Sequence, residues 1–203
     1  MALVEADISM SVDGFATGPD LDAFPGLGKG GEQLHAWLDE REGARLSEAT
    51  FAASGAFVTS RRVFDDTGGW AGHAKFWEEP AYAGYYGMPV FVVTHRAHEP
   101  VRTRATTFTF ITAGVAETLK AAAAAAGDKR VHIMGGASLV QQSLRTGLVE
   151  RLRLHIAPVL LGSGTALFDG APGPDLHHLD TVDTPGATHV TYRVGRLSPP
   201  GGR

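Results

Sequence analysis

Three short segments of the chain carry residue types that proteins use to bind extended, anionic ligands. The first is Gly135-Gly136-Ala137-Ser138, in which paired glycines lead from an apolar stretch into a helical pattern. Glycine lets a pyrophosphate approach the backbone closely, and the first turn of a helix offers free N–H groups. The alternative is a tight strand-to-helix turn that binds no ligand. The longer dinucleotide fingerprint GxGxxG is absent, so this motif alone does not decide between the two interpretations.

The second segment is Ser60-Arg61-Arg62, where a short strand pattern turns into a helical one. The planar fork of an arginine guanidinium suits phosphate oxygens, and two adjacent arginines can serve different phosphates. Read singly, the pair is equally consistent with two solvated surface arginines.

The third segment, Thr94-His95-Arg96, ends the most apolar and β-branched run of the chain. All three segments therefore follow predicted strands. In an open α/β sheet, ligands bind beyond the carboxyl ends of the strands. We expect one anionic, extended ligand to contact all three segments, with the arginines taking an extra phosphate. A loop rich in glycine over residues 13–31 is expected to be mobile and to cover the same end of the sheet.

The hydrophobic pattern predicts the elements that position these segments. Short apolar or alternating runs predict strands at residues 3–10, 56–59, 89–94, 106–112, 131–134, 152–161, 176–182 and 188–196. Helical spacing predicts helices over 32–53, 115–126 and 137–147, with short ones after residue 60 and near 74–78. Strands that alternate with helices and then follow one another predict an α/β fold, parallel over much of its width.

Composition limits the classes of protein that remain. The chain has 203 residues, of which 43% are hydrophobic, and this suits one domain over residues 1–197 followed by a disordered tail at 198–203. A net charge of −4 argues against nucleic-acid binding. The N-terminal sequence lacks a signal-peptide pattern and no apolar run could span a bilayer, so we expect a cytoplasmic protein with no membrane partner. Without cysteine, and with nine histidines at no metal-ligand spacing, we expect no metal site.

The order and spacing of six segments resemble the dihydrofolate reductase-like family, in particular the RibD C-terminal type, which is the reductase domain of bacterial riboflavin biosynthesis. The resemblance extends from about residue 4 to residue 196. The segments are 11–16 (SVDGFA), 58–64 (VTSRRVF), 89–95 (PVFVVTH), 132–137 (HIMGGA), 148–152 (LVERL) and 157–164 (APVLLGSG).

This resemblance implies a three-layer fold around a mostly parallel sheet of about eight strands that ends in an antiparallel hairpin. It implies NADPH as the hydride donor, a small-molecule substrate and a homodimer. The residues that it assigns to the cofactor are Ala6, Ser60, Arg61, Arg62, Thr94, His95, Arg96, Gly135, Gly136, Ala137 and Ser138. Among these, residues 94–96 are expected to line the side of the adenosine 2′-phosphate and residues 135–138 to cradle the pyrophosphate.

The substrate side is less well defined by the resemblance. Trp37 and His155 are expected to lie near the substrate ring. Folate reductases carry a carboxylate on the first helix, and Leu34 stands at that position here. The candidates for the proton donor are therefore Asp13, Glu32 and His35, or solvent.

The expected function is NADPH-dependent reduction of a small pterin- or pyrimidine-like heterocycle. Two alternatives stay open at this point. One is the riboflavin-pathway reduction of a ribosylaminopyrimidine. The other is a nucleotide-binding or sensor protein without turnover.

Overall fold

The computed structural model describes residues 2–66, 87–102, 106–168, 170 and 172–196. The short helix predicted at 74–78 and the tail predicted at 198–203 lie outside the described residues. Within them, a nine-stranded sheet forms the centre of the molecule, accompanied by a separate two-stranded sheet. No helix among these residues has the length and apolar character needed to cross a membrane.

The central sheet is mostly parallel, as predicted. Its strands are β1 (Val4–Ser11), β3 (Ser54–Ser60), β4 (Val90–Val93), β5 (Val101–Arg102), β6 (Thr107–Ile111), β7 (Arg130–Ile133), β8 (Arg151–Ala157), β10 (Leu176–Thr184) and β11 (Ala187–Val194). They lie in the order β10-β11-β8-β1-β7-β3-β4-β6-β5. The six strands from β8 to β6 run parallel, β5 is an antiparallel edge, and β10 and β11 form the predicted antiparallel hairpin.

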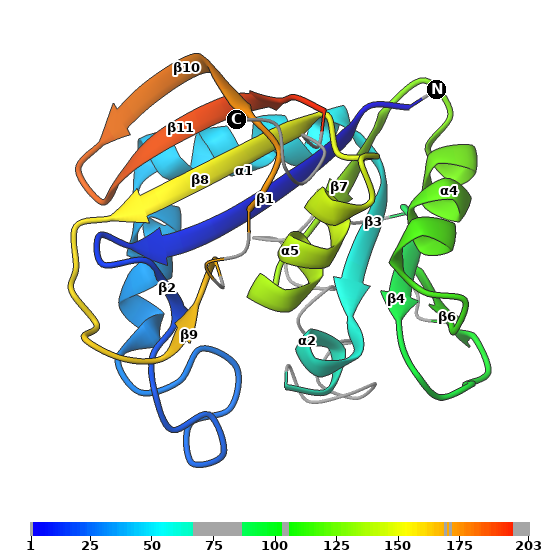
Figure 1. Ribbon diagram of the computed structural model, residues 1–203, viewed down its shortest axis with the longest axis horizontal. Coiled ribbons are helices and arrows are strands. Elements are labelled where there is room, and N and C mark those ends of the chain that lie inside the picture. The colour runs from blue at the N-terminus through cyan, green and yellow to red at the C-terminus, as the bar shows by residue number, and fades with distance from the viewer. Residues whose placement is uncertain (1, 67–86, 103–105, 169, 171, 197–203) are drawn as a thin grey trace.

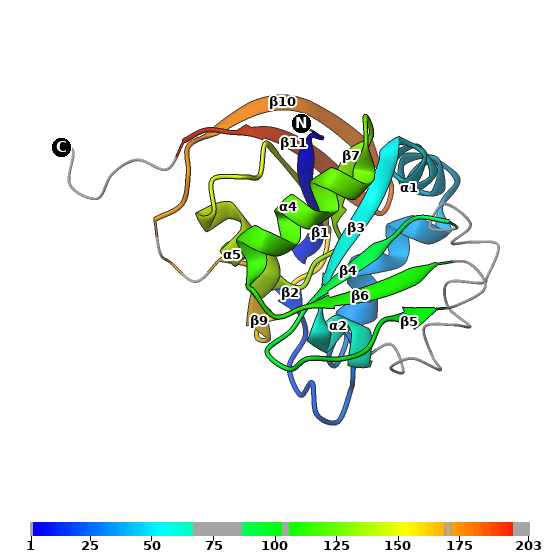
Figure 2. The ribbon, with the colours of Figure 1, turned by 90° about the vertical axis from the view of Figure 1, so that its right-hand side faces the viewer.

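Helices cover both faces of this sheet and complete three layers. Figures 1 and 2 show α4 (Val115–Ala126) and α5 (Ala137–Arg145) on one face. The other helices of the described residues are the 3-10 helix η1 (Gly31–Asp39), α1 (Arg41–Ala53) and the short α2 (Arg61–Asp66), and α1 lies on the opposite face. The predicted three-layer α/β architecture is therefore confirmed.

The central strand β3 shows why both layers form. Ala56 and Val58 belong to the apolar cluster that includes α4 and α5, while Phe57 belongs to a second cluster that includes Phe51 of α1. All of these side chains except Phe51 are 0% exposed. A strand buried on both faces needs a continuous rather than an alternating apolar run.

One predicted helix is interrupted, and one predicted strand ends earlier than expected. The single helix predicted over 32–53 is broken at Glu40, whose backbone is extended (φ −91°, ψ 149°) and whose Oε2 accepts the N–H of Gly186 at 3.0 Å. The strand predicted over 152–161 ends at Ala157, because Pro158 follows and has no N–H to donate to a ladder.

The glycine-rich loop folds on itself beside the carboxyl end of β1. The N–H of Gly18 donates to the carbonyl of Leu27 at 2.7 Å, and the N–H of Lys29 donates to that of Pro19 at 2.8 Å. The loop follows β2 (Phe15–Thr17), which pairs with β9 (Thr165–Ala166) in the two-stranded sheet. The loop predicted over 13–31 is thus interrupted by β2, and from residue 18 its backbone is hydrogen-bonded to itself. Its role as a cover over a ligand stays a prediction.

Candidate functional site

The three predicted ligand-binding segments follow neighbouring parallel strands. Strand β3 lies between β7 and β4, so the segments that begin at Gly135, Arg61 and Thr94 leave the same edge of the sheet. A methyl group placed on Gly136 would lie 3.8 Å from Val63 Cγ2, so the start of α5 lies against α2. Figure 1 shows α2 directly beyond the arrowhead of β3. The convergence expected from the sequence is present in the topology.

The N-terminus of α5 has the form expected of an anion cradle. Gly135 adopts φ +89°, a conformation that favours glycine, and among the described residues only the side chain of Ile8 lies within 4 Å of a methyl group placed there. Gly136 is the N-cap residue and makes no side-chain capping hydrogen bond. Ala137 is buried, and Ser138 is exposed with Oγ accepting from Gln142 Nε2 at 2.9 Å. The first-turn N–H groups and the positive end of the helix dipole can therefore face a phosphate.

The start of α2 is held by its own side chains. Ser60 Oγ accepts the N–H of Val63 at 3.2 Å and so caps the helix. Arg61 Nε donates to both carboxylate oxygens of Asp65 at 2.9 Å, and its guanidinium lies 5.6 Å from the ring centre of Phe110. The side chain of Arg61 is still 36% exposed, and Arg62 is exposed. Both arginines lie just after β3, at the edge where the sequence predicts an anion, and their contact with it stays a prediction.

The segment after β4 forms a compact turn. Thr94 is buried, its N–H donates to the carbonyl of Ile111 at 3.1 Å, and its Oγ1 accepts the N–H of Arg96 at 3.2 Å. His95 and Arg96 are exposed beside it. Thr94 therefore positions the turn, whereas His95 and Arg96 present charge-bearing groups to solvent.

Ala6 lies away from the surface of this edge. It is 0% exposed, pairs with Ile133 and Leu152 on either side, and packs into the apolar cluster of α4 and α5. Its predicted contact with a nicotinamide stays a prediction.

The three predicted proton donors lie on two segments, Asp13 just after β1 and both Glu32 and His35 on η1. Asp13 tethers two loops, because its carboxylate accepts the N–H of Leu161 at 3.2 Å and that of Gly162 at 2.7 Å. Hydrogen bonds, first from Ser11 and then from these amides, lower the pKa of Asp13. Glu32 is exposed on η1. No hydrogen bond or ion pair in the described part of the chain joins it to Asp13.

His35 lies on the solvent side of η1, two residues before the buried Trp37. Partial loss of hydration around its ring lowers the pKa of His35, and the nearby His155 lowers it further. A neutral imidazole at neutral pH is a weak source of protons.

Trp37 and His155, the two predicted substrate residues, lie against each other inside the molecule. Their ring centres are 4.2 Å apart in a stacked arrangement, and the two residues are 5% and 3% exposed. Trp37 Nε1 donates to Ser9 Oγ on β1 at 3.1 Å. The pair therefore closes the interior between η1 and the sheet, and its contact with a substrate stays a prediction.

His155 also belongs to a buried polar network that was not predicted from the sequence. Its Nε2 lies 2.5 Å from Asp7 Oδ1 on β1, and its Nδ1 lies 2.5 Å from Nδ1 of His189 on β11. Burial raises the pKa of Asp7, but the hydrogen bond from His155 and the electrostatic effects of His155, His132 and Arg153 together leave this pKa well below its ordinary value. Burial, and then the proximity of His155, lower the pKa of His189 to about 4.

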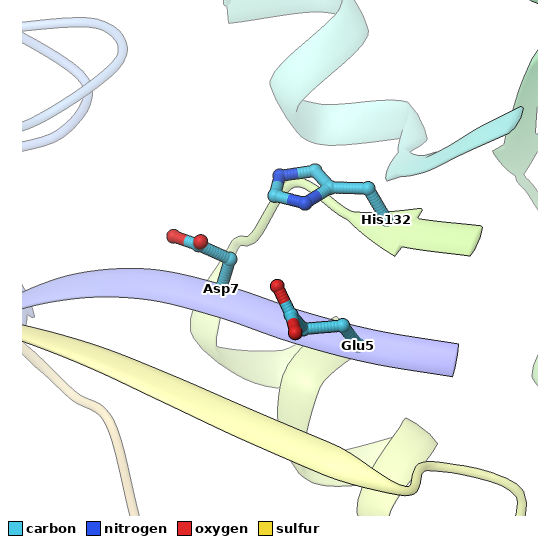
Figure 3. A group of neighbouring side chains, drawn as sticks. All are labelled: Glu5, Asp7 and His132. Atoms are coloured by element: carbon cyan, nitrogen blue, oxygen red, sulfur yellow. The ribbon is translucent and has the colours of Figure 1, made fainter. Parts of the chain in front are cut away.

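A group of possible metal ligands borders this network. Figure 3 shows Glu5 and Asp7 of β1 facing His132 of β7, and their ligand atoms lie within 4.8 Å of one another. Arg130 NH1 lies 3.4 Å from Glu5 Oε2, and Arg153 NH1 lies 3.6 Å from Asp7 Oδ2. Two guanidinium charges already balance the two carboxylates, so a divalent cation would leave a buried excess of positive charge. The group fits a charge-balanced network better than a metal centre.

The sequence held one signal for the network. Glu5, Asp7, Ser9 and Ser11 alternate along β1 and must share one face of the strand. This alternation indicates a group of polar side chains on one face of β1. It does not identify their partners, because Asp7 and His155 are 148 residues apart in the sequence.

Comparison with known proteins decides the family. The family of the RibD C-terminal domain matches residues 2–184 of the chain. The chain belongs to the RibD C-terminal domain family. The family predicted from the sequence is thus confirmed, although no curated protein matched the chain.

Solved structures agree with the RibD C-terminal assignment at the level of the fold. A protein from Shewanella sp. PV-4 whose name refers to riboflavin biosynthesis has a TM-score of 0.69 and 19% identity, with coverage of 97% of this chain and 100% of that one. A pyrimidine reductase-like protein from Corynebacterium diphtheriae has a TM-score of 0.60 and 17% identity, covering 96% and 92%. Dihydrofolate reductase from Enterococcus faecalis, complexed with NADP(H), has a TM-score of 0.56 and 13% identity, covering 95% and 96%.

Proposed function

We propose that the protein is an NADPH-dependent reductase that transfers hydride to a small heterocycle of pyrimidine or pterin type. The observation that carries the proposal is the glycine-led N-terminus of α5 lying against α2 at the edge where β7, β3 and β4 end. Membership of the RibD C-terminal domain family supports the reductase class.

The residues at this edge fit NADPH part by part. The N–H groups at the start of α5 suit the pyrophosphate, because that helix has no side-chain cap and its glycines leave room for a close approach. Arg61 and Arg62 supply positive charge next to it, and His95 and Arg96 suit the 2′-phosphate. NADPH, when bound, supplies the hydride, and the protein positions the acceptor and excludes water.

The first helical segment favours a pyrimidine over folate as the substrate. Leu34, at the position of the helix carboxylate in folate reductases, is 0% exposed. Glu32 and Asp39 are exposed and point to no buried partner in the described contacts. A ribosylaminopyrimidine of the riboflavin pathway is therefore the preferred member of the proposed substrate class.

Calorimetric titration with NADPH and NADH tests the cofactor. We expect NADPH to bind more tightly than NADH, and Arg96→Ala to weaken NADPH about tenfold while leaving NADH nearly unchanged, because one charge-assisted contact is lost. Arg45→Ala, on the exposed face of α1, is the matched control. Absence of NADPH binding at millimolar concentration would overturn the proposal.

Turnover separates the reductase from a binding protein. NADPH oxidation, followed by absorbance against a panel of aminopyrimidinones and pterins, is expected to show at least one acceptor. Tight NADPH binding with no oxidation across the panel would favour the sensor alternative.

A further inference from the structure

A chain of hydrogen-bonded side chains crosses the interior from the β10–β11 hairpin to β1. Thr184 Oγ1 lies 3.1 Å from His189 Nε2, and His189 Nδ1 lies 2.5 Å from His155 Nδ1. His155 Nε2 lies 2.5 Å from Asp7 Oδ1. The strands set this path, because His155 and His189 stand directly opposite each other in the β8–β11 register.

The charge on Asp7 fixes the direction of the hydrogen bond at one end of the chain. An ionised carboxylate only accepts, so Nε2 of His155 must carry the proton that it shares with Asp7. In the arrangement that a relay toward Asp7 requires, Nδ1 of His155 accepts from Nδ1 of His189, and Nε2 of His189 accepts from the hydroxyl of Thr184. That hydroxyl also lies 3.2 Å from its other acceptor, the carbonyl oxygen of Ala187.

The chain is buried in the middle and reaches accessible surface at its two ends. The side chain of His155 is 4% exposed, whereas that of Asp7 is 13% exposed. His189 is 3% exposed, and Thr184 at the hairpin turn is half-buried. Trp37 stacks on His155 and meets the edge of His189 at 4.9 Å between ring centres, which keeps water out of the middle of the path.

Charged groups on four neighbouring elements face this chain. Arg153 of β8 lies 3.6 Å from Asp7 and also pairs with Glu5 of β1. His132 of β7 and His35 of η1 act on the network through space, and Asp183 of β10 acts on His189. Arg153 and His155 together keep Asp7 in the form that accepts protons.

We propose that Thr184, His189 and His155 relay a proton from the hairpin turn to Asp7, and that Asp7 delivers it to the heteroatom of the reduced substrate. The proposal rests on the proposed reductase function. It offers a proton source other than the three residues predicted from the sequence, and it requires Asp7 to contact the substrate.

The step balances as the addition of one hydride and one proton. Hydride from NADPH forms a C–H bond at the acceptor carbon, the C=N or C=O π pair moves to the heteroatom, and NADP⁺ leaves. That heteroatom takes a proton from the Asp7 carboxyl, which receives its proton from His155 Nε2. His155 is reprotonated at Nδ1 by His189, and His189 at Nε2 by Thr184, whose hydroxyl regains a proton from water. The two imidazole tautomers then reset before the next turnover.

Nitrogen-15 NMR of histidine-labelled protein tests the relay without substrate. We expect Nε2 rather than Nδ1 of His155, and Nδ1 rather than Nε2 of His189, to carry the proton. Asp7→Leu removes the acceptor and should abolish both preferences. Asp7→Asn keeps the shape without the charge, serves if the leucine variant does not fold, and should weaken them. A wild-type His155 protonated on Nδ1, or tautomers unchanged in a folded Asp7 variant, would overturn the relay.

Kinetics with an acceptor that the wild-type protein reduces provide the second readout. We expect His189→Gln to lower kcat by roughly 100-fold and to raise the solvent deuterium isotope effect, with KM and NADPH affinity nearly unchanged. His177→Gln, on the exposed strand β10, should match the wild type. An unchanged kcat and isotope effect in His189→Gln would overturn the relay. A wild-type protein that fails to bind NADPH would instead overturn the proposed function. The NMR experiment would still test the hydrogen-bond chain, because it needs no cofactor or substrate.

Discussion

At Gly136, the effect of a substitution on helix stability can be separated from its effect on cofactor binding. Its backbone (φ −48°, ψ 171°) suits an aspartate N-cap, and within the described part of the chain a methyl group placed there meets only Val63, at 3.8 Å. We predict that Gly136→Asp folds with equal or slightly higher stability, since aspartate caps helices well. The same carboxylate would repel the pyrophosphate and weaken NADPH binding tenfold or more, as measured by calorimetry.

Gly136→Asn is the uncharged control and should retain most of the NADPH affinity. Equal affinity of the aspartate variant and the wild type would show that the pyrophosphate does not bind at the start of α5.

His189 links the buried network to stability at mildly acidic pH. Its pKa is about 4 in the folded protein against an ordinary 6.5, so the unfolded chain binds the extra proton first as the pH falls. We predict that the free energy of unfolding declines as pH drops from about 6.5 to about 4. His189→Gln should make that decline shallower in urea titrations at pH 7 and pH 4.5, whereas His177→Gln should not. An identical decline in wild type and His189→Gln would contradict this prediction.

At the scale of elements, Asp13 couples two loops at the carboxyl end of the sheet. Its carboxylate accepts two backbone N–H groups from the segment after β8. We predict that Asp13→Ala speeds hydrogen exchange at the amides of Leu161 and Gly162 at least several-fold, because the two amides lose their acceptor. Asp22→Ala, in the loop that follows β2, is the control. Unchanged exchange at both amides would show that the loops are held by other contacts.

The elements themselves were largely predictable from the sequence. The apolar run at 89–94 and the alanine-rich helix at 115–126 carry their structure in their own residues, and β4 and α4 match them. The break at Glu40 was not predictable from periodicity, because a hydrogen bond to Gly186, 146 residues away, helps to fix it. Local patterns report local structure, and tertiary contacts decide where it stops.

Part of the candidate site was also predictable from local sequence patterns, and part of it depends on tertiary contacts. The glycine turn at 135–136 and the arginines at 61–62 are visible in the sequence because each follows its own strand. The network of Asp7, His155 and His189 was not visible, because it is assembled by the order β11-β8-β1 from three distant strands. The topology of the sheet, more than any motif, creates this part of the interior.

The homodimer stays a prediction at the scale of the whole molecule. We expect light scattering coupled to size-exclusion chromatography to give twice the mass of one chain at micromolar concentration. A mass of one chain under those conditions would contradict it.

The account depends most on where NADPH binds, and an amide-resolved NMR titration of the wild-type protein with NADPH measures this directly. We predict the largest saturable shifts at residues 135–138, 61–63 and 94–96, at the shared edge of β7, β3 and β4. No shifts at millimolar NADPH, or shifts confined to the β10–β11 hairpin, would contradict it.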